Sequence, residues 1–325
     1  MKRDLLALLI IALLVVSCKD KTSNNTTSEQ QYESAPVFSA DSAFSFVSNQ
    51  VKFGPRVPNT DAHIQCGDYL ISTLKSYCDT VYIQPFTAIT YDGKKLKSRN
   101  IIGSFGMNKT KRVLLAAHWD SRPVADHDAN PLNRTKPIDG ANDGASGVGI
   151  LLEIARQLAV KNPEIGIDII FFDSEDWGTP SGTQVEGDWW CLGSQYWAKN
   201  PHVLNYKADY GILLDMVGGT GAKFYQEGVS IQYAQPIVQK IWGKAHRLGF
   251  HDFFINEPSN PLIDDHLYVN KLTGIPMVDI IHQDNSTGTG FTYTWHTSAD
   301  NMSNIDAKTL DVVGKTVLAV IYAEK

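Results

Sequence analysis

Residues 113–120 read VLLAAHWD, an apolar run that ends in a histidine, a tryptophan and an aspartate. Three other short runs are almost continuously apolar: 167–172 (IDIIFF), 211–216 (GILLDM) and 276–281 (PMVDII). Runs of this kind are typical of strands buried on both faces. Apolar residues at helical spacing fill the intervening and following segments, at Gly144–Leu158, Ser230–Leu248 and Asp306–Ala323. The alternation predicts an α/β fold, a single three-layer α/β/α domain with a mostly parallel twisted central sheet.

Acidic and imidazole side chains lie at or near the ends of these strands, where parallel sheets bind their ligands. Five can ligate a metal, namely His118, Asp143, Asp176, Asp215 and His296. Carboxylates and imidazoles suit Zn²⁺, and a catalytic zinc keeps three protein ligands and one open position. One such residue alone is more often a helix cap or a satisfied histidine. Their joint placement, with Glu175 beside one of them, predicts a zinc site.

The composition excludes some functions. The chain of 325 residues has 43% hydrophobic residues, enough for a large core, and a net charge of −6. Because the balance is acidic and no basic run occurs, we expect no nucleic-acid partner. No feature of the sequence argues for an oligomer, so we expect a monomer.

The N-terminus has the features of an export signal. Met1–Arg3 is basic, and the apolar run Leu5–Val16 is shorter than the roughly 20 residues that span a bilayer. Residues 15–18 (VVSC) resemble the lipobox of bacterial lipoproteins; the alternative is a plain signal peptide with an incidental cysteine. We expect three segments: a lipoprotein signal peptide at 1–17, a lipidated Cys18 with a flexible polar tether over 18–35, and the catalytic domain over 36–325. The protein is then exported and anchored to the membrane through Cys18, on the periplasmic or outer-membrane face.

Three cysteines remain beyond Cys18. Cys66 and Cys78 are the closest pair and can bridge outside the cytoplasm, but Cys191 makes the count odd and leaves one free thiol. The sequence leaves the pairing open.

A series of motifs runs in order through most of the predicted domain. After FGPRVP at 53–58 they are AHWDS at 117–121, GANDGASG at 140–147, FFDSED at 171–176, GSQYWA at 193–198, LLDMVG at 213–218, IDDH at 263–266 and WHT at 295–297. In these motifs the chain resembles the zinc-dependent glutaminyl cyclases, which share a fold with the co-catalytic zinc aminopeptidases. The resemblance implies an enzyme that converts the N-terminal glutamine of peptides and proteins to pyroglutamate, with release of ammonia.

The resemblance also implies roles for individual residues. Asp143, Asp176 and His296 match the ligands of one zinc ion per chain. Glu175 matches the glutamate that moves protons, and Asp215 and Asp264 match the acids that accompany it. Trp295 matches an aromatic wall of the substrate pocket, to which we add Trp177 and Phe291. Beyond the ligands, Asp120 is similar to an aspartate that orients a strand-end histidine, here His118, and Asp279 falls in an acidic hydrogen-bond network.

Two positions depart from the animal cyclases. The ligand after the proton-moving glutamate is Asp176 rather than a glutamate, so its carboxylate sits one methylene closer to the backbone. Asp279 stands where animal cyclases place a histidine. These positions put the local loop geometry and the protonation of the network in question.

A zinc aminopeptidase is the alternative, because all five ligands of a two-zinc site are present by type. A second zinc at His118, Asp143 and Asp215 favours an activated water and hydrolysis. Asp264 and Trp295 discriminate, since cyclases carry both, although Asp264 can also be a helix cap and Trp295 a core residue. A third alternative is a degenerate member that binds peptides without turnover; the intact Glu175 and ligand set argue against it.

Overall fold

The structure, a computed structural model, describes residues 35–325. Its strands are β1 (Thr80–Ile89), β2 (Lys95–Phe105), β3 (Arg112–His118), β4 (Gly166–Phe172), β5 (Tyr210–Asp215), β6 (Phe224–Gln226), β7 (Phe254–Pro258) and β8 (Met277–Ile281). Its helices are α1 (Ala40–Val51), α2 (Asp61–Lys75), α3 (Ala145–Val160), α4 (Leu192–Lys199), α5 (Gly228–Arg247), α6 (Asp265–Thr273), the 3₁₀ turn η1 (Met302–Asn304) and α7 (Ala307–Ile321). The predicted signal peptide, Cys18 and nearly all of the predicted tether lie outside the described residues.

Six strands form the central sheet in the order β1-β2-β4-β3-β5-β8. The four strands predicted from their apolar runs are adjacent and parallel, β4 with β3, β3 with β5 and β5 with β8. At one edge β2 pairs antiparallel with β4, and β1 pairs antiparallel with β2. The prediction of a mostly parallel sheet is confirmed, with an antiparallel hairpin added at its edge.

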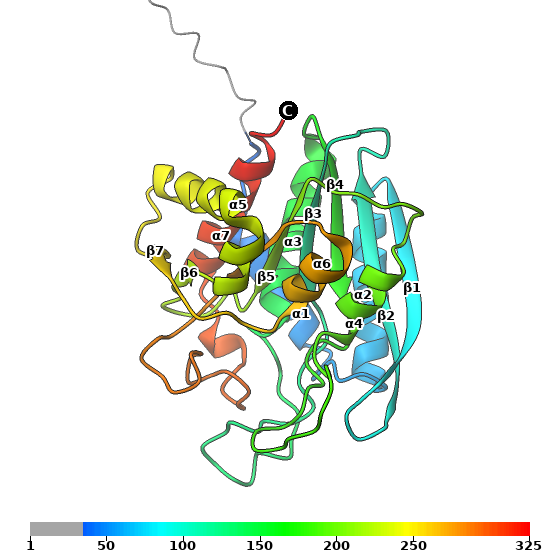
Figure 1. Ribbon diagram of the computed structural model, residues 1–325, viewed down its shortest axis with the longest axis vertical. Helices are drawn as coiled ribbons and strands as arrows, with labels where there is room; N and C mark the ends of the chain where they lie inside the picture. Colours follow the sequence, from blue (N-terminus) through cyan, green and yellow to red (C-terminus); the bar gives the residue numbers. More distant parts are fainter. Residues whose placement is uncertain (1–34) are drawn as a thin grey trace, which may run out of the picture. The chain divides into compact units, whose positions relative to one another are not determined.

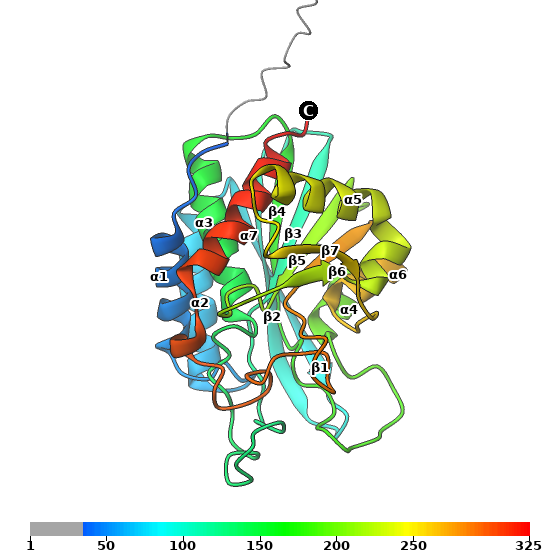
Figure 2. The ribbon, with the colours of Figure 1, turned by 90° about the vertical axis from the view of Figure 1, so that its left-hand side faces the viewer.

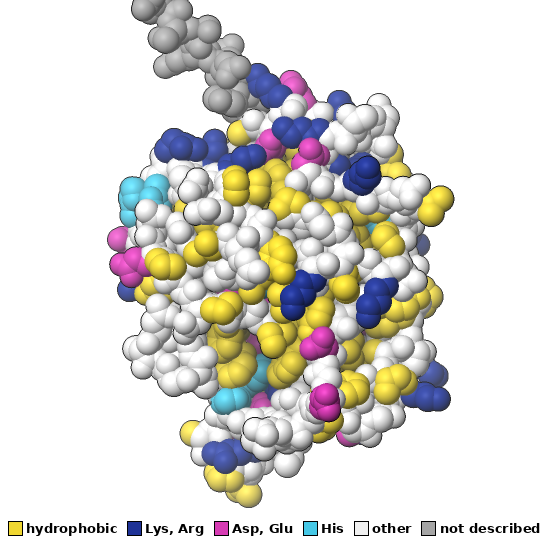
Figure 3. Space-filling view, viewed as in Figure 1, with side chains coloured by type: hydrophobic (Ala, Val, Ile, Leu, Met, Phe, Trp, Pro, Cys, Tyr) yellow, Lys and Arg dark blue, Asp and Glu magenta, His cyan; other side chains and the backbone are white. Residues whose placement is uncertain are grey.

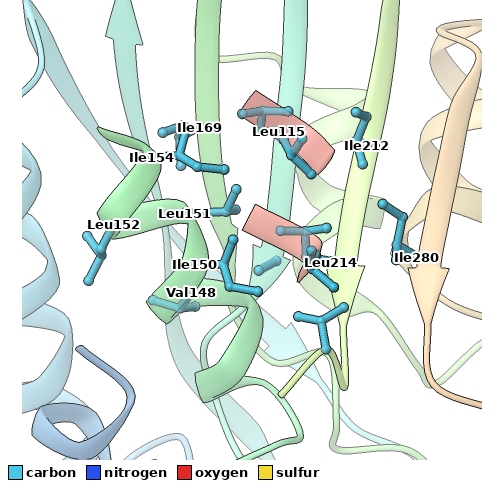
Figure 4. Packing of buried hydrophobic residues seen from close by; sticks show 14 of the residues in the cluster. Leu115, Val148, Ile150, Leu151, Leu152, Ile154, Ile169, Ile212, Leu214 and Ile280 are labelled. Carbon is cyan, nitrogen blue, oxygen red and sulfur yellow. The ribbon is translucent and has the colours of Figure 1, made fainter. Parts of the chain in front are cut away.

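The parallel strands are buried on both faces, as their sequences predict. In β3, the alternate residues Val113, Leu115 and Ala117 belong to one hydrophobic cluster, whereas Leu114 and Ala116 belong to another. Successive side chains of a strand point to opposite faces, so the sheet separates two apolar layers. Figure 4 shows the first layer, in which Leu151 and Ile154 of α3 point toward the strands that carry Leu115, Ile169 and Ile212.

Helices cover both faces of the sheet and make the two outer layers. Contacts join α1, α3 and α7 to one another, and α3 lies on β3. On the other face α4 contacts β2, α6 contacts β8, and the two helices contact each other. Figure 2 shows α1, α2 and α3 on one side of the sheet and α4 and α6 on the other. The three-layer α/β/α prediction is confirmed.

Long loops gather beyond the carboxyl ends of the parallel strands. Figure 1 shows them beyond one end of the sheet, among them the segment between β3 and α3 and the segment between β4 and α4. Cys66, Cys78 and Cys191 are free thiols. Within residues 35–325, the helices are all too short or too polar to span a membrane.

Candidate active site

The parallel strands end at the same edge of the sheet and bring predicted residues together there. His118 is the last residue of β3 and Asp215 the last of β5, while Glu175 and Asp176 follow the end of β4. Each of these four residues is at most 8% exposed. Charged groups buried this deeply need partners, so their mutual contacts define the chemistry of the site.

Asp143, Asp176 and His296, the three implied zinc ligands, form one cluster in which the ligand atoms lie within 4.8 Å of one another. His296 Nε2 is 3.3 Å from Asp176 Oδ1 and 3.7 Å from Asp143 Oδ2. Burial, and next the Arg122 charge, hold the pKa of His296 well below its usual value, which favours the neutral ring that ligates metals. Asp176 Oδ2 is buried and has no hydrogen-bond partner among the described residues. Because such an oxygen is costly unless a cation meets it, this donor set fits zinc.

A second cluster shares Asp143. His118 Nε2 lies 3.0 Å from Asp143 Oδ1 and 3.1 Å from Asp215 Oδ1. Burial lowers the pKa of His118, but its hydrogen bonds with the neighbouring aspartates raise it well above its usual value. Burial raises the pKa of Asp215 to about 7. Ligand atoms of His118, Asp143 and Asp215 lie within 4.8 Å of one another, so this cluster too has the composition of a metal site.

Asp120 holds the loop that carries Glu175 and Asp176. Its two carboxylate oxygens accept hydrogen bonds from the backbone N–H groups of Glu175 at 3.0 Å and Asp176 at 3.2 Å. His118 Nδ1 lies 3.6 Å from Asp120 Oδ1, slightly beyond hydrogen-bond distance. The closest contacts of Asp120 thus position the Glu175–Asp176 backbone, a role the resemblance did not imply.

Asp300 supports the other acidic ligand, and sequence reasoning missed it. Its carboxylate accepts hydrogen bonds from the backbone N–H groups of Asn142 at 2.7 Å and Asp143 at 3.1 Å. Burial, and next the charge of Asp143, raise the pKa of Asp300 to about 8. The sequence feature that could have pointed to Asp300 is its position four residues after the ligand His296.

A cavity of about 130 Å³ opens onto these groups. Its polar lining comes from members of both clusters and from two further acids; these residues are Asp143, Glu175, Asp176, Asp215, Asp264 and His296. Trp190, Leu262, Ile263, Phe291 and Trp295 supply most of its apolar lining.

Trp177 does not line this cavity, which corrects one expectation. It packs into a separate hydrophobic cluster with Val57, Phe86, Ala88 and Leu96, and Lys94 Nζ lies 5.4 Å from its ring centroid. Asp176 and Trp177 are neighbours on the loop, and only Asp176 faces the cavity. The tryptophan from this segment that reaches the cavity is Trp190, whose ring lies parallel to that of His296 at 6.0 Å.

Phe291 and Trp295 form the aromatic wall at the predicted place. The ring centroid of Trp295 lies 4.5 Å from Phe291, 3.8 Å from His296 and 4.4 Å from His127. Trp295 is half-buried and lines the cavity, so it is not a core residue. On the face drawn in Figure 3, apolar side chains surround histidine and acidic side chains in the lower half of the molecule.

Glu175 lies in the cavity among other acids. Burial raises the pKa of Glu175 well above its usual value, and the charges of Asp176 and Asp264 add to the effect while His118 opposes it. The thiol of Cys191 donates a hydrogen bond to Glu175 Oε1 at 3.2 Å. Sequence reasoning missed this contact, although Cys191 stands two residues before the GSQYWA motif.

The acidic network extends from the cavity into the protein. Asp264 caps the start of α6, as its structural alternative requires, and also lines the cavity. Side-chain atoms of Asp264, His266 and Asp279 lie within 4.8 Å of one another. Burial raises the pKa of Asp264 and raises that of Asp279 well above its usual value. On the far side Glu227 contacts His266 Nε2 at 2.9 Å, so the cluster combines an imidazole with protonatable carboxyls.

This sheet, with acids and imidazoles around a small cavity at its carboxyl edge, defines a metal-dependent α/β enzyme of the aminopeptidase type. The profile described as peptidase family M28 matches residues 100–321, and the chain belongs to that family.

Solved structures of very similar chains carry names of two kinds. A Zn-dependent exopeptidase from Parabacteroides distasonis is 57% identical, with 89% of this chain and 99% of that chain covered and a TM-score of 0.88. The glutaminyl cyclase of Tannerella forsythia is 56% identical, with 89% and 100% covered and a TM-score of 0.88. The glutaminyl-peptide cyclotransferase of Drosophila melanogaster is 23% identical, over 79% of this chain and 73% of its own length.

Proposed function

We propose that this chain is a glutaminyl-peptide cyclotransferase, which closes the N-terminal glutamine of a peptide or protein into pyroglutamate and releases ammonia. The observation that carries the proposal is the shared lining of one small cavity. Glu175, Asp264 and Trp295 all face it, together with the three implied zinc ligands. The similarity to the Tannerella cyclase over nearly the whole described chain supports it.

The proposed reaction needs a substrate whose first residue folds back on itself. In the reaction, the α-amine nitrogen attacks the γ-amide carbon, the bond from that carbon to the amide nitrogen breaks, and ammonia leaves. Since both reacting groups belong to one residue, closing the five-membered ring is effectively unimolecular once the side chain is held. Trp295 and Phe291 supply apolar surface that keeps water from the reacting atoms.

Glu175 moves the protons. Its carboxylate accepts a proton from the attacking amine and gives it to the departing nitrogen, so one group acts first as base and then as acid. The burial that raises its pKa matches this double role. Asp264 and Asp215 line the same cavity, and their carboxyl oxygens accept hydrogen bonds from the amino terminus and hold it near Glu175.

Asp143, Asp176 and His296 hold a single zinc ion in this proposal. When bound there, zinc supplies Lewis-acid polarisation of the γ-amide carbonyl. We assign one ion because the zinc-dependent glutaminyl cyclases, which the motifs of this chain resemble, hold one zinc per chain on the residues that match these three. His118, Asp143 and Asp215 also bring their ligand atoms within 4.8 Å of one another, so the zinc content of the protein separates this one-zinc site from the two-zinc site of an aminopeptidase.

The proposal is tested with a pair of peptides that differ only at the amine. A glutamine-initiated peptide should release one ammonia per molecule, followed with an enzyme-coupled ammonia assay. The N-acetylated form of the same peptide should release none, because its nitrogen is no longer a nucleophile. Ammonia from the acetylated peptide would mean hydrolysis of the side-chain amide and would contradict cyclisation.

We further propose that the protein acts as a monomer and is exported and anchored to the membrane, on the periplasmic or outer-membrane face, through a lipid on Cys18. The support is the sequence, a basic start and an apolar run followed by VVSC at residues 15–18. Labelling cells with a radioactive fatty acid should mark the protein and fail to mark the Cys18→Ser variant. Equal labelling of the wild-type protein and the variant would contradict a lipid anchor at Cys18.

A further inference from the structure

Two charged residues outside the ligand set, Arg122 and Asp126, contact both ends of the proposed zinc site. They lie on the segment between β3 and α3, and the Arg122 side chain is 1% exposed. Asp126 accepts two hydrogen bonds from the guanidinium, at 2.7 Å from Nε and 2.8 Å from Nη2. A paired, bidentate contact of this kind fixes both side chains in one geometry.

The guanidinium of Arg122 holds Asp176, the ligand whose side chain is one methylene shorter than the glutamate of the animal cyclases. Arg122 Nη1 donates to the backbone oxygen of Asp176 at 3.1 Å and to its Oδ1 at 3.2 Å. The second carboxylate oxygen of Asp176 stays unpartnered among the described residues. Arg122 therefore fixes both the loop and the side chain of Asp176 while leaving one oxygen for the metal.

The carboxylate faces the ligand histidine. Asp126 Oδ1 lies 3.6 Å from His296 Nδ1, slightly beyond hydrogen-bond distance, and this ring nitrogen is buried and has no hydrogen-bond partner among the described residues. The next residue, His127, donates its backbone N–H to the carbonyl oxygen of His296 at 3.2 Å, which keeps the two segments together. Histidine ligands of metals usually donate their second ring nitrogen to such a carboxylate, which fixes the tautomer and the ring orientation.

The same pair touches the loop that closes the cavity. Asp126 Oδ2 accepts a hydrogen bond from the backbone N–H of Ser181 at 2.7 Å. The guanidinium carbon of Arg122 lies 4.8 Å from the ring centroid of Trp190, a cation–π distance. The pair thus joins two ligands to the cavity wall that Trp190 forms.

We propose that Asp126 and Arg122 are positioning residues of the zinc site. Asp126 orients His296, Arg122 orients Asp176, and the carboxylate of Asp126 balances the charge of the guanidinium. Without Asp126, the buried guanidinium of Arg122 keeps Asp176 as its one carboxylate partner among the described contacts, and Asp176 is shared with the proposed zinc ion. Without the fork of Arg122, Asp176 loses the contacts that make up for its short side chain, and lysine cannot form them all. This inference rests on the zinc site of the proposed function.

The test compares Asp126→Asn and Arg122→Lys with Asp128→Asn. Asp128 is a matched control because it lies on the same segment and its carboxylate holds Ser298 and Asn130 rather than a ligand. Zinc affinity is measured on the metal-stripped full-length protein by competition with a chromogenic chelator. We expect Asp126→Asn and Arg122→Lys to weaken zinc binding about 10- to 100-fold, and Asp128→Asn to leave it within about threefold of wild type.

Two further readouts separate positioning from a merely structural role. The visible spectrum of the cobalt(II)-substituted protein should change in Asp126→Asn and Arg122→Lys and stay that of wild type in Asp128→Asn. The thermal midpoint of each metal-free variant shows whether that variant folds. Arg122→Lys keeps the buried positive charge, so this variant still tests the inference if Asp126→Asn does not fold. Wild-type zinc affinity and an unchanged cobalt spectrum in a folded Asp126→Asn or Arg122→Lys variant would overturn the inference. No readout uses a substrate, so a protein that binds zinc as described but cyclises nothing refutes only the proposed function.

Discussion

Glu175→Gln should lower the rate of pyroglutamate formation about 10³-fold while the protein still binds zinc. Positioned proton transfer contributes about 10²- to 10⁴-fold to enzymatic rates, and here one carboxylate serves both transfers. Glutamine has nearly the same shape but cannot take a proton from the amine. Glu175 lines the cavity but is not among the three proposed ligands, so the zinc content should stay at the wild-type value. The measurement is kcat on a glutamine-initiated peptide, with zinc determined on the same sample.

The matched control is Glu186→Gln. Glu186 is exposed on the loop between β4 and α4, so its variant should keep the wild-type rate. A zinc-loaded Glu175→Gln variant that retains more than about a tenth of the wild-type rate would remove Glu175 from the proton-moving role.

His296→Ala should abolish activity because the variant loses the zinc ion. His118→Ala should still bind zinc. Both histidines are buried and each faces Asp143, but the proposal makes only His296 a ligand. Removing one of three ligands leaves two carboxylates, which do not make a zinc site of the usual kind. Equilibrium dialysis should find about one zinc per chain for wild type and His118→Ala, and well below that for His296→Ala.

Two outcomes would contradict the one-zinc assignment. Two zinc ions per wild-type chain, with one lost in His118→Ala, would place a metal in the cluster of His118, Asp143 and Asp215. Full zinc binding by His296→Ala would mean that the three implied ligands are not the ones that hold it.

The sequence predicted the parallel core because burial on both faces leaves an unmistakable pattern. The strands around Leu115, Ile169 and Leu214 are continuous apolar runs, and each was placed within a residue of its bounds. The β1–β2 hairpin was not predicted, because β1 alternates exposed and buried residues and contains Pro85. Alternation of this kind is typical of an edge strand and is a weaker signal than a continuous apolar run.

The candidate site was predicted where it coincides with strand ends or motifs. His118 and Asp215 close their strands, and the carboxyl ends of parallel strands share one edge. The loops could not be predicted in the same way. Arg122 reaches Asp176 across 54 positions of sequence, and such contacts between loops leave no periodic pattern. The same reason explains the expectation for Trp177, since sequence proximity to Asp176 says nothing about which side of a loop a side chain faces.

The most direct test of the proposed function is mass spectrometry of the zinc-loaded protein incubated with Gln-Phe-amide and Leu-Phe-amide together. We expect the glutamine peptide to lose the mass of one ammonia and the leucine peptide to stay intact. Release of free leucine would contradict the proposed function, because a site that hydrolyses the peptide bond is that of an aminopeptidase, and the proximity of Asp264 and Trp295 to the cavity would then need another explanation.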